Sequence, residues 1–163
     1  MPPVFRKRWQ RDSKLGADAV PIDDGNCFAC GADNAIGLHL HFERAGTQSV
    51  LGHTTLEPQF QGWRDVAHGG IVIALLDEAM AHAAGAAGFR GVTASLRTRF
   101  RGPVPLGRQL DIYGEVRWMR RNVLGLYARV SEDKRVLAEG EGHFVSRGPI
   151  DPSSDLARKL ERT

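Results

Sequence analysis

The feature that most constrains the fold is an apolar block from residue 70 to residue 87, built mainly from Ile, Val, Ala, Leu and Met. Its length favours a helix, because strands rarely exceed about ten residues. A helix that is apolar nearly all round must be enclosed by other elements. Asp77, Glu78 and His82 lie near its middle and argue against a membrane span. Gly85 and Gly88 are the expected stops.

Stretches with the alternation and flanking turns of β-strands surround this block. Two strands are expected before the block, at 38–43 and 48–56, and a loop at 58–67 leads into the helix. Four strands are expected after it, at 92–100, 109–118, 123–131 and 136–146. This order predicts an α+β fold in which a curved antiparallel sheet of five to six strands wraps around one central helix. A single sheet leaves an open edge, which predicts association with a second copy.

The chain of 163 residues suffices for one domain with a substantial core. We expect that domain over residues 26–148, between a polar lead-in at 1–25 and a polar tail at 149–163 with a short helix at 153–162. The first residues lack the apolar segment of a signal peptide, and two cysteines are too few for a disulfide framework. A cytoplasmic location is therefore expected.

Positive charge is concentrated after the apolar block, although the net charge is only +3. Residues 90–121 contain eight arginines against two acidic residues. Such a segment suits a polyanionic ligand, either nucleic acid or a phosphate-bearing small molecule such as coenzyme A. A solvated strand face explains the arginines equally well.

Two features of the expected helix carry chemistry. Asp77 and Glu78 lie among apolar residues, where a carboxylate is costly unless it is paired or serves a site. Burial would raise the pKa of such a carboxyl group, which suits a nucleophile or general base. The His68-Gly69-Gly70 turn presents free N–H groups at the helix start, suited to polarising a carbonyl. Alternatively, the two carboxylates lie on a solvated stripe or form a salt bridge. The alternative for the HGG turn is an ordinary glycine turn with a structural histidine.

Taken together, residues 60–80, with a carboxylate nine residues after the His of an HGG turn, resemble the hotdog-fold acyl-CoA thioesterases of the 4-hydroxybenzoyl-CoA and phenylacetate-degradation type. The stretch Cys27-Phe-Ala-Cys-Gly-Ala-Asp-Asn-Ala-Ile-Gly-Leu38 is similar to the opening segment of one branch of that family. Residues 98–107 are similar to its strand-Pro-Leu-Gly segment. The resemblance covers roughly residues 27–147.

The resemblance implies hydrolysis of an acyl-CoA or acyl-carrier thioester, without a cofactor beyond the coenzyme A of the substrate. Asp77 would be the nucleophile or general base, Gly69 and Gly70 would polarise the carbonyl, and His68 would shape the turn. Further roles follow for water positioning (Thr93), for the CoA phosphates (Arg97, Arg99, Arg120, Arg121) and for the acyl pocket (Trp63). The family also implies a homodimer or homotetramer in which different subunits supply the HGG turn and the carboxylate.

Two departures from the family pattern concern the site. Many members have Asn or Gln six residues before the His, whereas this chain has Gly62, with Gln61 one position earlier as the substitute. Strict alternation also places Thr93 on the same strand face as Arg97 and Arg99. Either a bulge intervenes or one of those assignments is wrong.

Cys27 and Cys30 admit a second interpretation. With His39 and His41 they supply the four donors of a tetrahedral zinc site. Two histidines two residues apart on a strand are unlike the usual helical pair, and the family resemblance favours a structural Cys-Gly turn without metal.

Three other functions are compatible with parts of the sequence. A hotdog protein that binds an acyl-CoA without catalysis has no need of Asp77, and hydratases of this fold use an Asp/His pair in a different sequence setting. Nucleic-acid binding ranks lowest, because no binding motif and few aromatic residues accompany the arginines. The acyl group is left open.

Overall fold

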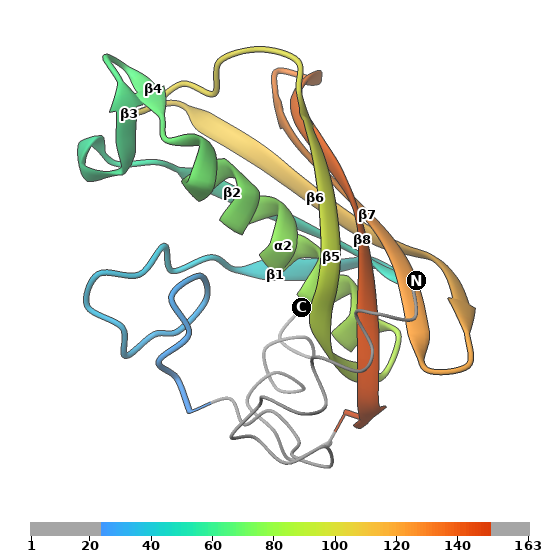
Figure 1. Cartoon of the computed structure of the whole chain (residues 1–163). Coiled ribbons are helices and arrows are strands. Elements are labelled where there is room, and N and C mark those ends of the chain that lie inside the picture. Colours follow the sequence, from blue (N-terminus) through green and yellow to red (C-terminus); the bar gives the residue numbers. More distant parts are fainter. Residues whose placement is uncertain (1–23, 151–163) are drawn as a thin grey trace.

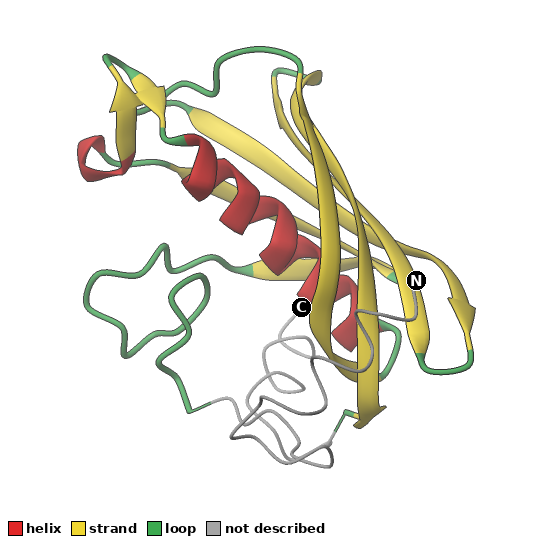
Figure 2. Ribbon diagram, in the orientation of Figure 1, coloured by secondary structure: helices red, strands yellow, loops and turns green. Residues whose placement is uncertain are grey.

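The computed structural model describes residues 24–150, in which one helix is enclosed by one large sheet (Figures 1 and 2). The sheet is antiparallel, with the strand order β1-β2-β6-β7-β8-β5. The strands are β1 (Phe42–Gly46), β2 (Ser49–Thr55), β5 (Phe89–Phe100), β6 (Gln109–Arg120), β7 (Val123–Glu132) and β8 (Arg135–Pro149). Helix α2 (Gly69–Ala86) lies along the inner face of the curved sheet. The predicted α+β architecture is confirmed.

Helix α2 forms the centre of the core. One side of it is fully buried against the sheet, through Val72, Leu75, Leu76, Ala79, Met80 and Ala83. By length and composition alone α2 could cross a membrane, but 56% of it is buried inside this fold, as in a core helix. The helix ends at Ala86 and the chain turns at Gly88 (φ +90°), as predicted, whereas Gly85 lies inside the last turn.

A second side of α2 is only half-buried. Ile73, Ala74, Asp77 and Ala81 recur at the helical spacing of three to four residues and follow the exposed Gly70. We call these five residues the open stripe of α2. Apolar side chains left half-covered along a core helix form a surface that a second molecule can bury.

The segment expected as a plain loop at 58–67 is folded. It contains a 3₁₀ turn, η1 (Pro58–Phe60), and a small hairpin of β3 (Gln61–Trp63) and β4 (Val66–Ala67). This hairpin lies beside the start of α2 (Figure 1). Strands of two or three residues are too short to show a period, so sequence alternation could not reveal them.

The strand expected at 38–43 begins only at Phe42. His39 has φ +50°, in the left-handed region, which interrupts an extended backbone. The amides of Leu38 and Leu40 donate instead to the carbonyls of Phe28 and Ala29, both at 2.8 Å. Leu38 and Leu40 are nevertheless buried, so the alternation identified core residues but the strand assignment was wrong.

A β-bulge divides β5. Thr93 pairs with Phe144, but Ser95 pairs with the next residue of β8, His143, which leaves Ala94 as the extra residue. Before the bulge, Thr93 faces α2; after it, the odd-numbered residues of β5 face away from the helix. The expected helix at 153–162 and most of the lead-in lie outside the described residues.

Candidate active site

The N-terminus of α2 is capped by the side chain of His68. The His68 backbone is extended (φ −60°, ψ 135°), and its Nδ1 accepts a hydrogen bond from the Gly70 N–H at 2.9 Å. This bond requires the neutral imidazole with its proton on Nε2. Within residues 24–150, no group accepts the Gly69 N–H. Of the two amides expected to polarise a carbonyl, Gly70 is therefore occupied and Gly69 is available.

The turn is held in place from two sides. His68 N–H donates to the Phe60 carbonyl at 2.8 Å, and Ala67 N–H donates to the Val104 carbonyl at 2.8 Å. Gly62 lies directly against the turn, since a Cβ at this position would come within 3.0 Å of the His68 Cα. The close approach gives a physical reason why a longer side chain is missing at the position where family members carry Asn or Gln.

Phe100 lies beside the available amide. A Cβ built on Gly69 would be 3.7 Å from its Cζ, and the ring is 47% exposed. Sequence reasoning did not select Phe100, because a Phe at the end of a strand carries no functional signal. An exposed aromatic ring next to a free helix amide is suited to contact the acyl part of a substrate.

Asp77 lies two turns further along α2, at the centre of the open stripe. Thr93, at the bulge of β5, donates its hydroxyl to Asp77 Oδ1 at 2.7 Å. Oδ2 accepts no hydrogen bond from any residue in the described part of the chain. Thr93, which was expected to position a water, thus contacts the carboxylate itself, and one carboxylate oxygen is left for a substrate or water.

Burial raises the pKa of Asp77 above its usual value, because desolvation penalises the charged form. The Thr93 hydrogen bond opposes this effect and stabilises the carboxylate, while the neighbouring charge of Glu78 raises the pKa further. No arginine contributes to the shift. A desolvated carboxylate with a raised pKa is more basic than a solvated one, which suits proton abstraction or nucleophilic attack.

Glu78 faces a different part of the molecule. Its carboxylate accepts the His82 Nε2–H at 3.1 Å and lies 3.9 Å from the Cys27 Sγ. Adjacent helical residues point about 100° apart, and here only Asp77 lies on the open stripe. The two neighbouring carboxylates therefore belong to separate sites.

Asp77 and the Gly69 amide of one chain are too far apart to act on one carbonyl. Eight residues at 1.5 Å per residue separate them by about 12 Å along the helix. A reacting carbonyl must lie within about 3 Å of both groups. One chain thus holds both halves of such a site but does not bring them together.

The expected CoA-binding arginines do not form one cluster in the chain. Arg97 and Arg99 are exposed on β5, on the face turned away from α2, opposite Glu141 and Glu139 of β8. Arg120 and Arg121 lie at the β6–β7 turn, where Arg121 has φ +55°. The bulge at Ala94 resolves the conflict of faces, because it allows Thr93 to face inward and the two β5 arginines outward.

The remaining expected site residues lie in the β3–β4 hairpin. Gln61 Oε1 accepts the Asp65 N–H at 3.2 Å, so the amide side chain stabilises the hairpin turn rather than extending toward Asp77. Trp63 is 84% exposed. An indole with so little packing of its own is available to a ligand or a second subunit.

One long helix enclosed by a curved antiparallel sheet, with a capped glycine turn at the helix start and a carboxylate at its middle, defines a hotdog-fold protein. The thioesterase superfamily profile matches residues 65–139, which include the turn, α2 and four strands. Over this segment the chain is similar to the members of this superfamily. Among curated proteins, none matches the sequence.

Solved structures agree with this assignment. A thioesterase superfamily protein is 26% identical, with a TM-score of 0.72 over 87% of this chain and 74% of its own. A Streptococcus mutans UA159 protein bound to acetyl-CoA is 19% identical, with a TM-score of 0.65 over 69% and 91%. The E. coli PaaI protein from the phenylacetic acid degradation operon is 19% identical, with a TM-score of 0.64 over 69% and 82%. At 19% identity, the similarities to the S. mutans and E. coli proteins concern the fold alone.

Proposed function

We propose that the protein hydrolyses acyl-CoA thioesters to the free acid and the CoA thiol. The observation that carries this proposal is the half-buried Asp77 carboxylate, held by the Thr93 hydroxyl at 2.7 Å with Oδ2 left available. A protein that only binds a thioester gains nothing from a desolvated carboxylate on its open face. The match to the thioesterase superfamily profile and the acetyl-CoA bound to the S. mutans protein add support.

In the proposed reaction, the Gly69 N–H donates to the thioester carbonyl oxygen and stabilises the negative charge that develops on it. The positive end of the α2 dipole adds to this stabilisation. Asp77 either attacks the carbonyl carbon through Oδ2 or removes a proton from the attacking water. The C–S bond breaks, the thiolate leaves and is protonated, and water supplies the oxygen of the acid.

We propose that two copies of the chain build each site. Residue 73 lies midway between Gly69 and Asp77, so a twofold axis beside Ile73 would bring the amide of one subunit to the carboxylate of the other. The residues around this point, Ile73 and Ala74, are apolar and only half-buried, as expected at a contact between subunits. Dimer formation would cover the open stripe and exclude water from Asp77.

The arginines on β5 and at the β6–β7 turn would bind the phosphates of CoA, and Trp63 and Phe100 would contact the acyl group. Guanidinium groups suit phosphate because they donate two parallel hydrogen bonds. The acyl group itself is best identified with a panel of aromatic, short-chain and long-chain acyl-CoAs, assayed by thiol release.

The catalytic part is tested with Asp77→Asn, which keeps the shape of the side chain and removes its charge. We expect a loss of about 10²–10⁴-fold in kcat. The matched control is Asp111→Asn, because this carboxylate lies on β6 and pairs with His53 instead of contacting α2. Equal thiol release by wild type and Asp77→Asn would refute the role of Asp77. Acyl-CoA binding by wild type without thiol release from any substrate would favour the non-catalytic alternative.

The amide is tested with Gly69→Pro. Proline is well tolerated at the first residue of a helix, and the extended His68 backbone is compatible with a following proline. The substitution therefore removes one N–H with little change to α2, and we expect kcat to fall about 10²–10³-fold. Gly69→Ala is the control, because it keeps the amide and its Cβ meets Phe100 at an ordinary contact distance.

Mixing the two inactive variants tests the shared site. A mixed dimer of Asp77→Asn and Gly69→Pro chains contains one intact site, so activity should recover to about a quarter of wild type after subunit exchange. Mixed dimers are quantified with two affinity tags. If mixed dimers form and activity stays absent, the two groups do not act across subunits.

A further inference from the structure

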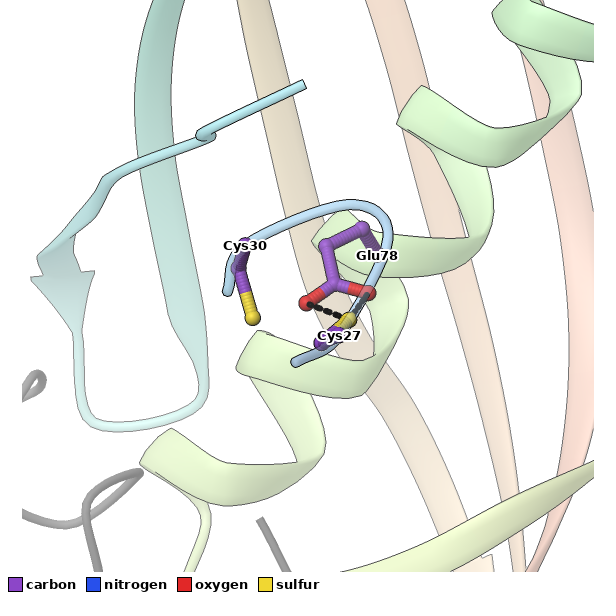
Figure 3. A group of neighbouring side chains, drawn as sticks. All are labelled: Cys27, Cys30 and Glu78. Carbon is purple, nitrogen blue, oxygen red and sulfur yellow. Dashed lines mark hydrogen bonds between the residues drawn. The ribbon is translucent and has the colours of Figure 1, made fainter. Parts of the chain in front are cut away.

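A second group of reactive side chains lies on the other side of α2. The thiols of Cys27 and Cys30 and the carboxylate of Glu78 converge, with one donor atom from each residue within 4.8 Å of the others (Figure 3). Cys27 Sγ lies 3.9 Å from both oxygens of Glu78. Cys30 is buried, Cys27 is half-buried, and the Glu78 side chain is 13% exposed. None of these residues takes part in the proposed hydrolysis.

The loop that carries the two cysteines is folded tightly without regular secondary structure. Gly31 N–H donates to the Cys27 carbonyl at 2.8 Å, so the backbone turns back over the Cys-x-x-Cys segment. A Cβ at Gly31 would lie 2.3–2.6 Å from backbone atoms of Gly25 and Cys27, so only glycine fits there. This turn aims both thiols at one point on the helix, which is how short Cys-x-x-Cys turns present ligands to a metal.

Glu78 is held in place by His82, one turn further along α2. His82 is 2% exposed, its Nε2 lies 3.1 Å from Glu78 Oε1, and its ring packs against Phe42 at 4.7 Å. The His82 Nδ1 is buried without a hydrogen-bond partner in the described part of the chain. A buried histidine that sacrifices one hydrogen bond to orient a carboxylate is typical of the outer shell of a metal site.

The donor set and its dimensions fit zinc. Two thiolates and a carboxylate are ligands that Zn²⁺ accepts, and tetrahedral geometry with the usual Zn–S and Zn–O bonds requires an S···O distance of about 3.6 Å. The observed 3.9 Å is close to that value. Two thiolates and one carboxylate also repel one another unless a cation lies between them.

We propose that Cys27, Cys30 and Glu78 bind one zinc ion, with a water as the fourth ligand. The ion would connect the irregular segment 24–41 to the middle of the core helix, since Glu78 follows the two cysteines by 48 and 51 positions. It would thus stabilise a segment that has no strand or helix of its own. Binding releases the protons of the two thiols. The histidines first considered as partners lie elsewhere: His39 Nδ1 contacts the Gly31 carbonyl at 3.1 Å, and His41 is exposed.

The test measures zinc in the full-length protein purified in a reducing buffer. We expect about one zinc per chain in the wild type, and a weakened affinity, by at least about tenfold, in Cys27→Ser, Cys30→Ser and Glu78→Gln. Asp77→Asn is the matched control, because it alters the neighbouring carboxylate and should keep the metal. His39→Ala and His41→Ala should keep it as well.

Three measurements need no variant and therefore do not depend on the folding of the substituted chains. Protein stripped by a chelator should regain zinc from a chromophoric indicator with release of protons, and its Tm should rise on zinc addition. Cobalt in place of zinc should show thiolate-to-metal charge-transfer absorption. Stripped protein that takes up neither metal would overturn the proposal, and so would zinc that remains bound in the Cys27→Ser/Cys30→Ser double variant.

Discussion

Replacement of His68 separates two roles that a histidine beside a catalytic turn can have. In the structure its Nδ1 caps α2 by accepting the Gly70 N–H at 2.9 Å, which a proton shuttle would not require. Asparagine is a good N-cap residue whose side-chain oxygen can accept the same amide, but it cannot transfer protons near neutral pH. Alanine can do neither. The pair His68→Asn and His68→Ala therefore distinguishes capping from proton transfer.

The expected magnitude follows from the position of the cap. Loss of an N-cap acceptor costs about 0.5–2 kcal/mol, and the exposed location of His68 favours a cost of about 1 kcal/mol. For a domain of this size, that cost lowers Tm by about 2–4 °C. We expect His68→Ala to show this loss with a fall in kcat of less than about tenfold. His68→Asn should stay close to wild type in both Tm and kcat.

Thermal unfolding followed by circular dichroism and thiol release under saturating substrate are the two assays. The reasoning is refuted if His68→Asn keeps the wild-type Tm but loses as much activity as Asp77→Asn, because His68 would then be a proton-transfer group. It is equally refuted if His68→Ala unfolds at the wild-type temperature, since the observed hydrogen bond would contribute nothing to the helix.

Three further predictions concern Asp77, the arginines and the hairpin. Thr93→Val removes a hydrogen bond worth about 1.5–3 kcal/mol to the charged carboxylate, so kcat/KM should fall about tenfold or more. Because this bond lowers the pKa of Asp77, the acidic limb of the pH–rate profile should move to higher pH in Thr93→Val but not in Thr93→Ser. The variants are compared at equal zinc content, and an acidic limb that does not move in Thr93→Val would show that the hydrogen bond does not affect the titration of Asp77. Arg97→Gln and Arg120→Gln should each raise KM roughly two- to fivefold for an acyl-CoA but not for the corresponding acyl-pantetheine, which lacks the nucleotide phosphates; an equal rise for both would contradict phosphate binding. Gly62→Ala should destabilise the fold by about 1 kcal/mol in urea unfolding, because its Cβ approaches the His68 backbone to 3.0 Å, and a neutral substitution would show that the hairpin yields at no cost.

The sequence predicted those features that repeat over many residues. The apolar block fixed the helix to within one residue at each end, and the alternation after it located all four strands of the second half. Features made of a few residues escaped prediction. The left-handed backbone of His39 and the hairpin of β3 and β4 depend on contacts with distant segments, which leave no period in the sequence.

For the candidate site, motif spacing selected Asp77 and the glycine turn, and the structure adds which atoms are available. That His68 occupies the Gly70 amide, leaving Gly69, depends on one side-chain rotation that no motif encodes. For Cys27 and Cys30 the sequence favoured a structural turn without metal and offered His39 and His41 as the alternative partners. The structure instead brings Glu78 to the two thiols from 48 residues or more along the chain. A contact between residues so far apart in sequence leaves no local pattern from which it could be predicted.

The bulge in β5 makes this strand sensitive to its pairing register. If Ala94 became an ordinary paired residue, strict alternation would put Thr93, Arg97 and Arg99 on one face, so the part of the strand on one side of Ala94 would have to turn over. Either Thr93 would leave Asp77, or Arg97 and Arg99 would turn toward the core helix in place of Leu96 and Thr98. Deletion of Ala94 has no such effect, because Thr93 and Ser95 already pair with the adjacent residues Phe144 and His143 and would keep their faces. The strand can therefore lose Ala94 more easily than it can pair it.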